Sequence, residues 1–303
     1  MTPSLQRILV PLDGSRLAEA VLPFAMGVAS RVGGTITLLH VIERNAPDSV
    51  HGQPHLKRDE DAHAYLDGVA ARCAVGTVRV ETHVHNPAIN DVAASIAEHA
   101  AELGADLIAI STHGSGGVRG LLLGDIAQQT LRLSTTSLLL VRPDASGEAQ
   151  PFECNELLLA VDPAVHGDIA LPVAAALASA CHARIRLVTV VPQAGELPPR
   201  RRAAAIFSPA STRAVLELER EDARDYLESK KAELKAQGVD CSIEVRTGDP
   251  VDEVAGMLQS RSADLLVLAT HGQTGLGALL AGSFGPRIML RAKLPVLLVR
   301  ATN

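Results

Sequence analysis

The sequence predicts an α/β protein made of two doubly wound domains, each with a five-stranded parallel sheet. Three observations support this fold class. The chain has 303 residues, enough for two domains of ordinary size, and 47% of them are hydrophobic. Its second half repeats the first, and short apolar runs alternate with helical stretches in each half. Aromatic residues make up only 2% of the chain, so its cores are aliphatic, as suits buried parallel strands.

The two halves of the chain are related by sequence identity at a fixed offset. Residues 107–142 align without a gap on residues 265–300, and 12 of these 36 positions are identical. Upstream the offset falls from 158 to 149, which places nine extra residues in the middle of the second half. A stretch rich in Asp, Ser, Gly and Pro separates the halves. We therefore expect domains at 1–143 and 155–303, joined by a linker at 144–154.

Continuous runs of Leu, Val and Ile indicate strands that are covered on both faces. In the first half, strands are expected at 8–12, 35–42, 78–84, 106–110 and 137–141. In the second half, they are expected at 157–161, 184–191, 242–246, 264–269 and 295–299. Helices are expected at 16–31, 90–103, 166–181, 213–236 and 250–261. Because strands alternate with helices, right-handed crossovers and a parallel sheet follow.

A glycine-spaced loop follows the fourth expected strand of each half. Thr-His-Gly ends at Gly114 in the first half and at Gly272 in the second, and another Gly follows at Gly124 and Gly282. Ligands of open α/β sheets bind beyond the carboxyl ends of the strands, and glycine lets the backbone come close to them. Ser283 then opens the next helix, where free N–H groups and the helix dipole favour an anion. This pattern predicts a phosphate site.

On these motifs the chain resembles a tandem universal stress protein, over nearly all of both halves. The nucleotide-binding branch of that family carries Gly-x2-Gly-x9-Gly-(Ser/Thr) after its fourth strand and an Asp at the end of its first strand. The second half matches from Ala269 to Ser283 with only the first Gly replaced, whereas the first half, from Ser111 to Asp125, departs at both ends. The resemblance implies adenine-nucleotide α-hydrolase-like, Rossmann-like sandwiches that pack as a pseudo-dimer through their fifth strands.

The resemblance also implies a function: a stress-response regulatory protein that binds ATP, with or without Mg²⁺, and has no dedicated chemical step. In the second half, the implied nucleotide contacts are Asp162, Val190, Ala269, His271, Gly272, Gly275, Gly282, Ser283 and Phe284. In the first half, they are Pro11, Asp13, Val41, Ser111, Gly114, Gly117, Gly124 and Asp125.

The two halves differ in their expected affinity for phosphate. Asp125 stands where Ser283 stands, as an expected helix cap that adds a negative charge. Two unit charges ~4 Å apart repel by roughly 4 kcal/mol at an effective dielectric constant near 20. In the second half, Pro163 removes one backbone donor beside Asp162, which is a smaller loss. We expect the second half to bind the triphosphate better, unless a cation such as Mg²⁺ bridges Asp125 and the phosphate.

Two alternatives to a nucleotide-dependent regulator remain open: a nucleotide-free interaction module, and an enzyme that hydrolyses ATP slowly. The lysine-bearing phosphate loop of P-loop ATPases is absent, as is a GxGxxG motif after the first strand. His113 and His271 have no nucleophile at a fixed spacing, so no catalytic residue is expected. The signatures of AMP-forming ligases and pyrophosphatases of the related fold are also missing, which places the enzyme interpretation behind the regulator.

Several polar clusters are interpreted as solvated surface. The stretch that holds His51, His55, Asp59, Asp61 and His63 is interpreted as a solvated loop in preference to a zinc site, because its spacing is irregular. His83 and His85 share one strand face, and Arg200–Arg202 is taken as a loop. No metal site is expected.

Composition narrows the partners and the location. A net charge of −6 argues against nucleic acid, and no apolar run approaches the length of a membrane span. The four cysteines form no CxxC pair, which fits reduced thiols in a cytoplasmic protein. The expected partners are an adenine nucleotide and the other repeat of the same chain, with a homodimer of whole chains as a further option.

Overall fold

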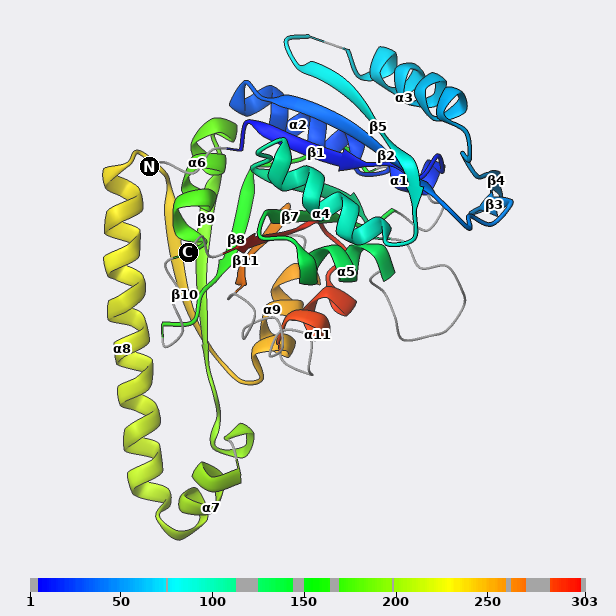
Figure 1. Cartoon of the computed structure of the whole chain (residues 1–303). Coiled ribbons are helices and arrows are strands. Elements are labelled where there is room, and N and C mark those ends of the chain that lie inside the picture. Colours follow the sequence, from blue (N-terminus) through cyan, green and yellow to red (C-terminus); the bar gives the residue numbers. More distant parts are fainter. Residues whose placement is uncertain are drawn as a thin grey trace. The chain divides into compact units, whose positions relative to one another are not determined.

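The computed structural model describes residues 5–74, 76–112, 125–143, 150–163, 169–197, 199–259, 263–270 and 284–300. The chain, drawn in Figure 1, divides into two compact units. Unit 1 comprises Met1–Glu153, Thr270–Gly277 and Leu294–Asn303, and unit 2 comprises Cys154–Ala269 and Ala278–Lys293.

Unit 1 is built on a mostly parallel sheet with the order β5-β2-β1-β6-β7-β12. Its parallel strands are β1 (Arg7–Pro11), β2 (Thr35–Glu43), β5 (Arg79–Ile89), β6 (Leu107–Ser111) and β7 (Ser137–Val141). The last strand of the chain, β12 (Val296–Arg300), pairs with β7 in antiparallel orientation, with Val296 opposite Leu140. These are the fifth strands of the two repeats.

Helices cover both faces of the unit 1 sheet (Figure 1). Right-handed crossovers place α2 (Leu22–Val32) and α3 (Asp59–Cys73) on one face, and α4 (Val92–Glu102) and α5 (Asp125–Leu133) on the other. The expected helix at 16–31 is divided into α1 (Arg16–Glu19) and α2, because Pro23 lies in the first turn of α2. A short hairpin of β3 (Ser49–Val50) and β4 (Gln53–Pro54) follows β2.

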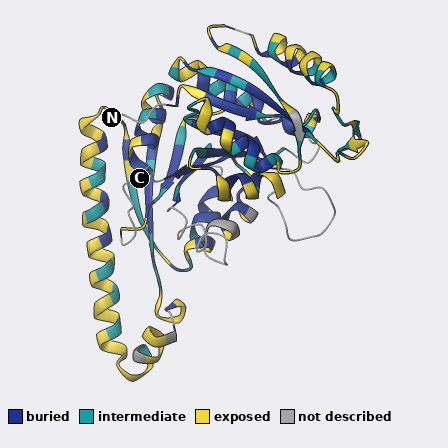
Figure 2. Cartoon of the chain, in the orientation of Figure 1, coloured by how far each residue is buried: buried dark blue, intermediate teal, exposed yellow. Residues whose placement is uncertain are grey.

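Unit 2 has the strand order β10-β9-β8-β11. These strands are β8 (Glu156–Ala160), β9 (Arg184–Val191), β10 (Cys241–Thr247) and β11 (Leu265–Thr270). Its helices are α6 (Leu171–Cys181), α7 (Pro199–Phe207), α8 (Pro209–Ala236), α9 (Pro250–Gln259) and α11 (Phe284–Arg291), with a 3₁₀ turn, η1, at Ala194–Glu196. The strands of both units are mostly buried, whereas α8 is exposed over much of its length (Figure 2).

Two segments that the sequence analysis interprets as loops are helical. Asp59, Asp61 and His63 lie on α3, where acidic residues in the first turn stabilise the helix through its dipole. The buried residues of this helix recur at helical spacing, as Ala62, Leu66, Val69 and Cys73. The segment Arg200–Arg202 lies on α7, which Pro199 begins, since a proline is favoured in the first turn of a helix. Of the described helices, none is long and apolar enough to cross a membrane.

The repeats anchor their first strands in the same way. In unit 1, the Asp106 carboxylate accepts a hydrogen bond from the backbone N–H of Arg7 at 2.9 Å. In unit 2, Asp264 accepts one from Glu156 at 3.0 Å. These pairs correspond under the sequence offsets, so the internal repeat extends to individual hydrogen bonds that hold the central strands.

Equivalent helices of the two units end with a left-handed residue. Gly33 ends α2 with φ 65°, and His182 ends α6 with φ 55°. Both ends are closed by bonds back to the last turn, from Gly34 to Ala29 O and from Ala183 to Ala178 O. Glycine adopts this conformation without strain, whereas another residue pays about 1–2 kcal/mol for it.

We therefore expect His182→Gly to stabilise the protein by about 1 kcal/mol, because it relieves a strained backbone in a helix ending that both repeats share. The shift of the guanidinium unfolding midpoint measures this gain. The matched variant Gly33→Ala should lower the midpoint. A His182→Gly protein no more stable than its parent would contradict the strain argument.

Candidate functional site

A cavity of about 450 Å³ lies at the carboxyl ends of β1, β2 and β6 in unit 1. We call it the unit 1 cavity. Its volume falls within the roughly 300–1,000 Å³ of typical small-molecule sites. The structure brings together around it every described unit 1 residue that the resemblance assigns to the nucleotide, namely Pro11, Asp13, Val41, Ser111 and Asp125. Their role as nucleotide contacts stays a prediction.

The end of the first strand is held by a side chain from the second strand. In unit 1, His40 is buried, and its Nδ1 lies 2.7 Å from the carbonyl oxygen of Leu12, the residue before Asp13. In unit 2, the hydroxyl of Thr189 donates to the carbonyl of Val161, the residue before Asp162, at 2.8 Å. Because a carbonyl oxygen only accepts, this contact is a hydrogen bond when Nδ1 of His40 carries the proton. Both repeats thus fix the backbone that presents the aspartate.

The threonine of each Thr-His-Gly motif has a structural partner. Thr112 donates its hydroxyl to Val141 O at 3.4 Å, and Thr270 donates to Val299 O at 3.2 Å. Both threonines are buried. These bonds tie the end of the fourth strand to the fifth strand at the point where the glycine loop starts.

The unit 1 cavity is rich in negative charge. Asp13, Glu43 and Asp125 contribute carboxylates, and none of the described lining residues is Lys or Arg. Asp125 is the first residue of α5, one position inside the helix and not at the capping position expected from the sequence. A carboxylate there still places negative charge at the helix start, so a phosphate would meet repulsion.

His55 belongs to the same cavity, and its surroundings favour the neutral imidazole. Its side chain is only 8% exposed, and its Nε2 lies 3.8 Å from a carboxylate oxygen of Glu43. Burial lowers the pKa of His55, although the Glu43 charge acts in the opposite direction. The side chain of His55 is therefore largely buried, contrary to the solvated loop expected for this stretch from the sequence.

Two polar residues of the site, His40 and Glu43, are not among those predicted from the sequence. His40 interrupts an otherwise apolar strand that is buried on both sides, and such a buried polar residue needs a hydrogen-bond partner. That interruption is the signal that could have identified it. Glu43 ends the same strand, so its place at the carboxyl edge follows once the strand is recognised.

In unit 2, part of the predicted site lies outside the described residues. Asp162, Val190 and Ala269 are placed at the carboxyl ends of β8, β9 and β11. Phe284 is the first residue of α11. The predicted residues beyond the described chain are His271, Gly272, Gly275, Gly282 and Ser283 in this repeat and Gly114, Gly117 and Gly124 in the other.

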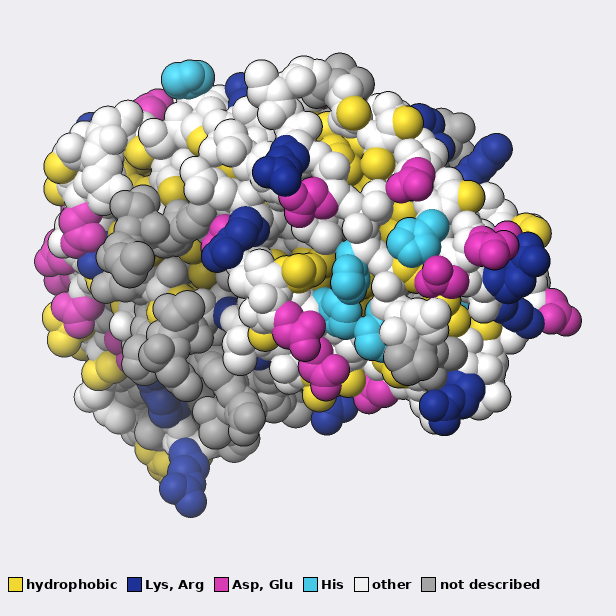
Figure 3. Space-filling view, turned by 45° about the horizontal axis from the view of Figure 1, so that its top comes forward, with side chains coloured by type: hydrophobic (Ala, Val, Ile, Leu, Met, Phe, Trp, Pro, Cys, Tyr) yellow, Lys and Arg dark blue, Asp and Glu magenta, His cyan; other side chains and the backbone are white. Residues whose placement is uncertain are grey.

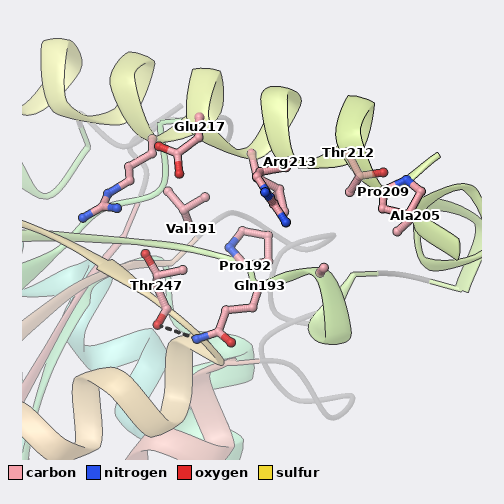
Figure 4. Close-up of a pocket in the computed structure, with 12 residues that line it drawn as sticks. Val191, Pro192, Gln193, Ala205, Pro209, Thr212, Arg213, Glu217 and Thr247 are labelled. Carbon is pink, nitrogen blue, oxygen red and sulfur yellow. Dashed lines mark hydrogen bonds between the residues drawn. The ribbon is translucent and has the colours of Figure 1, made fainter.

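Unit 2 contains a second cavity, of about 320 Å³, at the carboxyl ends of β9 and β10. Figure 4 shows Arg213 of α8 pointing toward Pro192 and Glu217 of the same helix lying over Val191. Gln193 donates its amide to the carbonyl of Thr247 at 3.3 Å across the floor. Arg220 also lines this cavity, which therefore carries two cationic side chains against one carboxylate. None of the predicted nucleotide contacts lines it.

Histidines gather on one face of the molecule (Figure 3). His83 and His85 on β5 both pack against His99 of α4, with ring centroids 4.8 and 4.9 Å apart. Contrary to a simple surface role, His85 Nδ1 lies 3.3 Å from His99 Nε2. Among the described residues, no group of three or more His, Cys, Asp or Glu is arranged to hold a metal ion.

This packing predicts an acid-sensitive fold. Burial, together with His99 and His85, lowers the pKa of His83. The unfolded chain then binds the proton more readily than the folded one, so stability is lost as pH falls below about 6.5. We expect the free energy of unfolding to drop between pH 7.5 and 5, and His83→Asn to make this drop shallower. Parallel pH profiles for the two proteins would refute the assignment to His83.

Comparison with known proteins gives one family for both halves. The sequence profile of the universal stress protein family matches residues 4–142 and 155–300. A universal stress protein of Mycolicibacterium smegmatis is 24% identical over 305 residues, covering 97% of this chain and 96% of that protein. Universal stress protein MJ0531 of Methanocaldococcus jannaschii is 34% identical over 86 residues, 28% of this chain. The chain matches only 51%, about half, of that relative.

Solved structures show the same fold along the whole chain. A universal stress protein from Archaeoglobus fulgidus superposes with a TM-score of 0.69 at 18% identity, covering 98% of this chain and 99% of that one. The functionally unknown protein PA1789 from Pseudomonas aeruginosa has a TM-score of 0.63 at 16% identity, covering 98% and 93%. At these identities the likeness concerns the fold alone.

Proposed function

The chain belongs to the universal stress protein family, and from this premise we propose that it is a cytoplasmic regulator that binds an adenine nucleotide at the carboxyl edge of its sheets. Bound ATP acts as an occupant that sets conformation or partners, with no dedicated chemical step. The triphosphate site belongs to the second repeat, and the first repeat is the weaker phosphate site.

The unit 1 cavity is the observation that supports this proposal most strongly. The cavity lies at the positions to which the family resemblance assigns the base and the ribose. Pro11, Asp13 and Val41 line it. The side-chain bond that fixes Leu12 beside Asp13 has a counterpart that fixes Val161 beside Asp162. In both repeats, a side chain of the second strand therefore fixes the backbone just before the aspartate at the same edge of the sheet.

Charge supports the choice of the second repeat for the triphosphate. Ser283 replaces Asp125 at the helix that receives the phosphate, which removes one negative charge. Arg213 and Arg220 also place positive charge at the carboxyl ends of β9 and β10, in the unit 2 cavity, beside the single carboxylate of Glu217. In unit 1 the described lining residues offer three carboxylates and no such cation.

The same proposal includes packing of the two repeats as a pseudo-dimer about their fifth strands. The antiparallel pairing of β7 with β12 supports it, because these strands come from different repeats. The competing functions are a nucleotide-free interaction module and slow ATP hydrolysis. Titration with ATP tests the first, and turnover of the bound ATP tests the second.

We expect calorimetric titration with ATP and Mg²⁺ to give one ATP per chain. Ser283→Asp should weaken this binding several hundred-fold or more, because it adds the repulsion of roughly 4 kcal/mol estimated for two unit charges ~4 Å apart. Gly282→Val should abolish the binding, since a side chain there blocks the approach of the backbone to the phosphate.

The matched variant in the other repeat is Asp125→Ser. It removes the negative charge from the start of α5 and should add a second ATP site. Unchanged stoichiometry and affinity would overturn the charge argument. A parent protein that binds no ATP at all would assign the chain to the interaction modules, and turnover of the bound ATP would assign it to the slow hydrolases.

A further inference from the structure

We propose that the unit 1 cavity selects an uncharged nucleoside with an exocyclic amine, and that His55 recognises this amine through Nδ1. This inference rests on the proposed function, because it takes the carboxyl edge of unit 1 as a site for the same heterocycle without its phosphates. In this inference the first repeat binds the uncharged nucleoside, and the second repeat binds the charged triphosphate of the same heterocycle.

His55 supplies a buried acceptor that the protein itself leaves unsatisfied. Its side chain is 8% exposed and lines the cavity. Its Nδ1 is buried, and no hydrogen-bond partner for it exists among the described residues. Buried polar atoms of this kind are nearly always hydrogen-bonded, so an unsatisfied one that lines a cavity indicates a ligand.

The neighbouring carboxylate determines which kind of ligand atom His55 accepts. Its Nε2 faces Glu43 at 3.8 Å, and a carboxylate favours the tautomer with the proton on Nε2. Nδ1 then holds a lone pair and accepts a hydrogen bond. A ligand that offers an N–H donor is matched to it, as the amine of adenosine would be.

The backbone around His55 is held from several directions, so its side chain is positioned in advance. The N–H of His55 donates to Asp48 O at 3.1 Å, and Gln53 of β4 accepts from the N–H of Arg16 at 2.7 Å. Leu56 packs on Gly14, whose φ of +90° favours glycine. The Nε2 atom of His40 lies 3.2 Å from the carbonyl oxygen of Leu56. This segment joins the covering hairpin to the end of β1.

Among the described residues of the second repeat, the arrangement around His55 has no counterpart. At the sequence offset of 149, Gly14 corresponds to Pro163, whereas the stretch that holds His55 falls where the second repeat carries its extra residues, on α7 and the start of α8. The stretch after β9 forms η1, α7 and the start of α8, where the stretch after β2 forms the hairpin. Among the described residues, recognition of this kind is therefore confined to the first repeat.

The walls and charges of the cavity exclude a polyphosphate but accept a nucleoside. Apolar side chains from β2, the hairpin, α4 and α5 can contact a flat ring: Val41, Val50, Ile96 and Ile126. Asp13 and Glu43 carry carboxylates, which only accept hydrogen bonds and so suit the hydroxyl groups of a ribose. Asp125 adds a third negative charge, so each phosphate on the ligand lowers its affinity.

The test is titration of adenosine into the full chain in the presence of saturating ATP and Mg²⁺. We expect one further adenosine per chain, bound roughly five- to ten-fold more tightly than purine riboside, which lacks the amine. His55→Leu should remove this preference and leave ATP binding unchanged. His63→Leu, at an exposed position on α3, is the matched control and should leave both unchanged.

The comparison of adenosine with purine riboside uses the unaltered protein, so it holds even where His55→Leu fails to fold. Equal binding of the two nucleosides, or AMP binding in place of adenosine, would overturn the inference. Adenosine binding that depends on His55, in a chain that takes up no ATP, would sustain it while the proposed function fails. Binding of one ATP per chain without any adenosine would overturn this inference and leave the proposed function standing.

Discussion

Parallel pairing is the constraint on which the whole site depends. Because β1 pairs in parallel with both β2 and β6, the carboxyl ends of three strands meet at one edge of the unit 1 sheet. One buried hydrogen bond then sets the fine geometry of that edge, from His40 in unit 1 and from Thr189 in unit 2. The residue types differ, yet each fixes the carbonyl just before the aspartate of its repeat. The duplicated fold has thus kept the same edge with different chemistry.

What separates the repeats is the charge and the covering of this shared edge. The unit 1 cavity is covered by a short hairpin and lined by three carboxylates, with His55 as a buried acceptor. Unit 2 carries a helical insertion in the same part of the chain, and its cavity is lined by two arginines from α8. Because both repeats retain the same edge of the sheet but differ in its charges, a single chain can bind a nucleoside at one repeat and its triphosphate at the other.

The strands could be predicted because continuous Leu, Val and Ile runs carry the signal of burial on both faces, and because such runs recur in both repeats. The helix α3 was missed because its first turn is acidic and polar, which resembles a loop, although its buried residues recur at helical spacing. Asp13, Val41 and Ser111 could be placed at one edge, since the strands that carry them end there. The burial of His55 could not be predicted, because it depends on contacts of Leu56 and Gln53 with the end of β1 and the start of α1.

Photolabelling of the unaltered chain with 2-azidoadenosine and 2-azido-ATP, followed by peptide mapping, tests the central claim most directly. The two reagents share a heterocycle and differ in charge, so they report which repeat each form occupies. The account predicts adenosine label in peptides of residues 1–143 and ATP label in peptides of residues 155–303, each displaced by its own unlabelled ligand. Label from both reagents in one repeat, or no displaceable label from either, would contradict it.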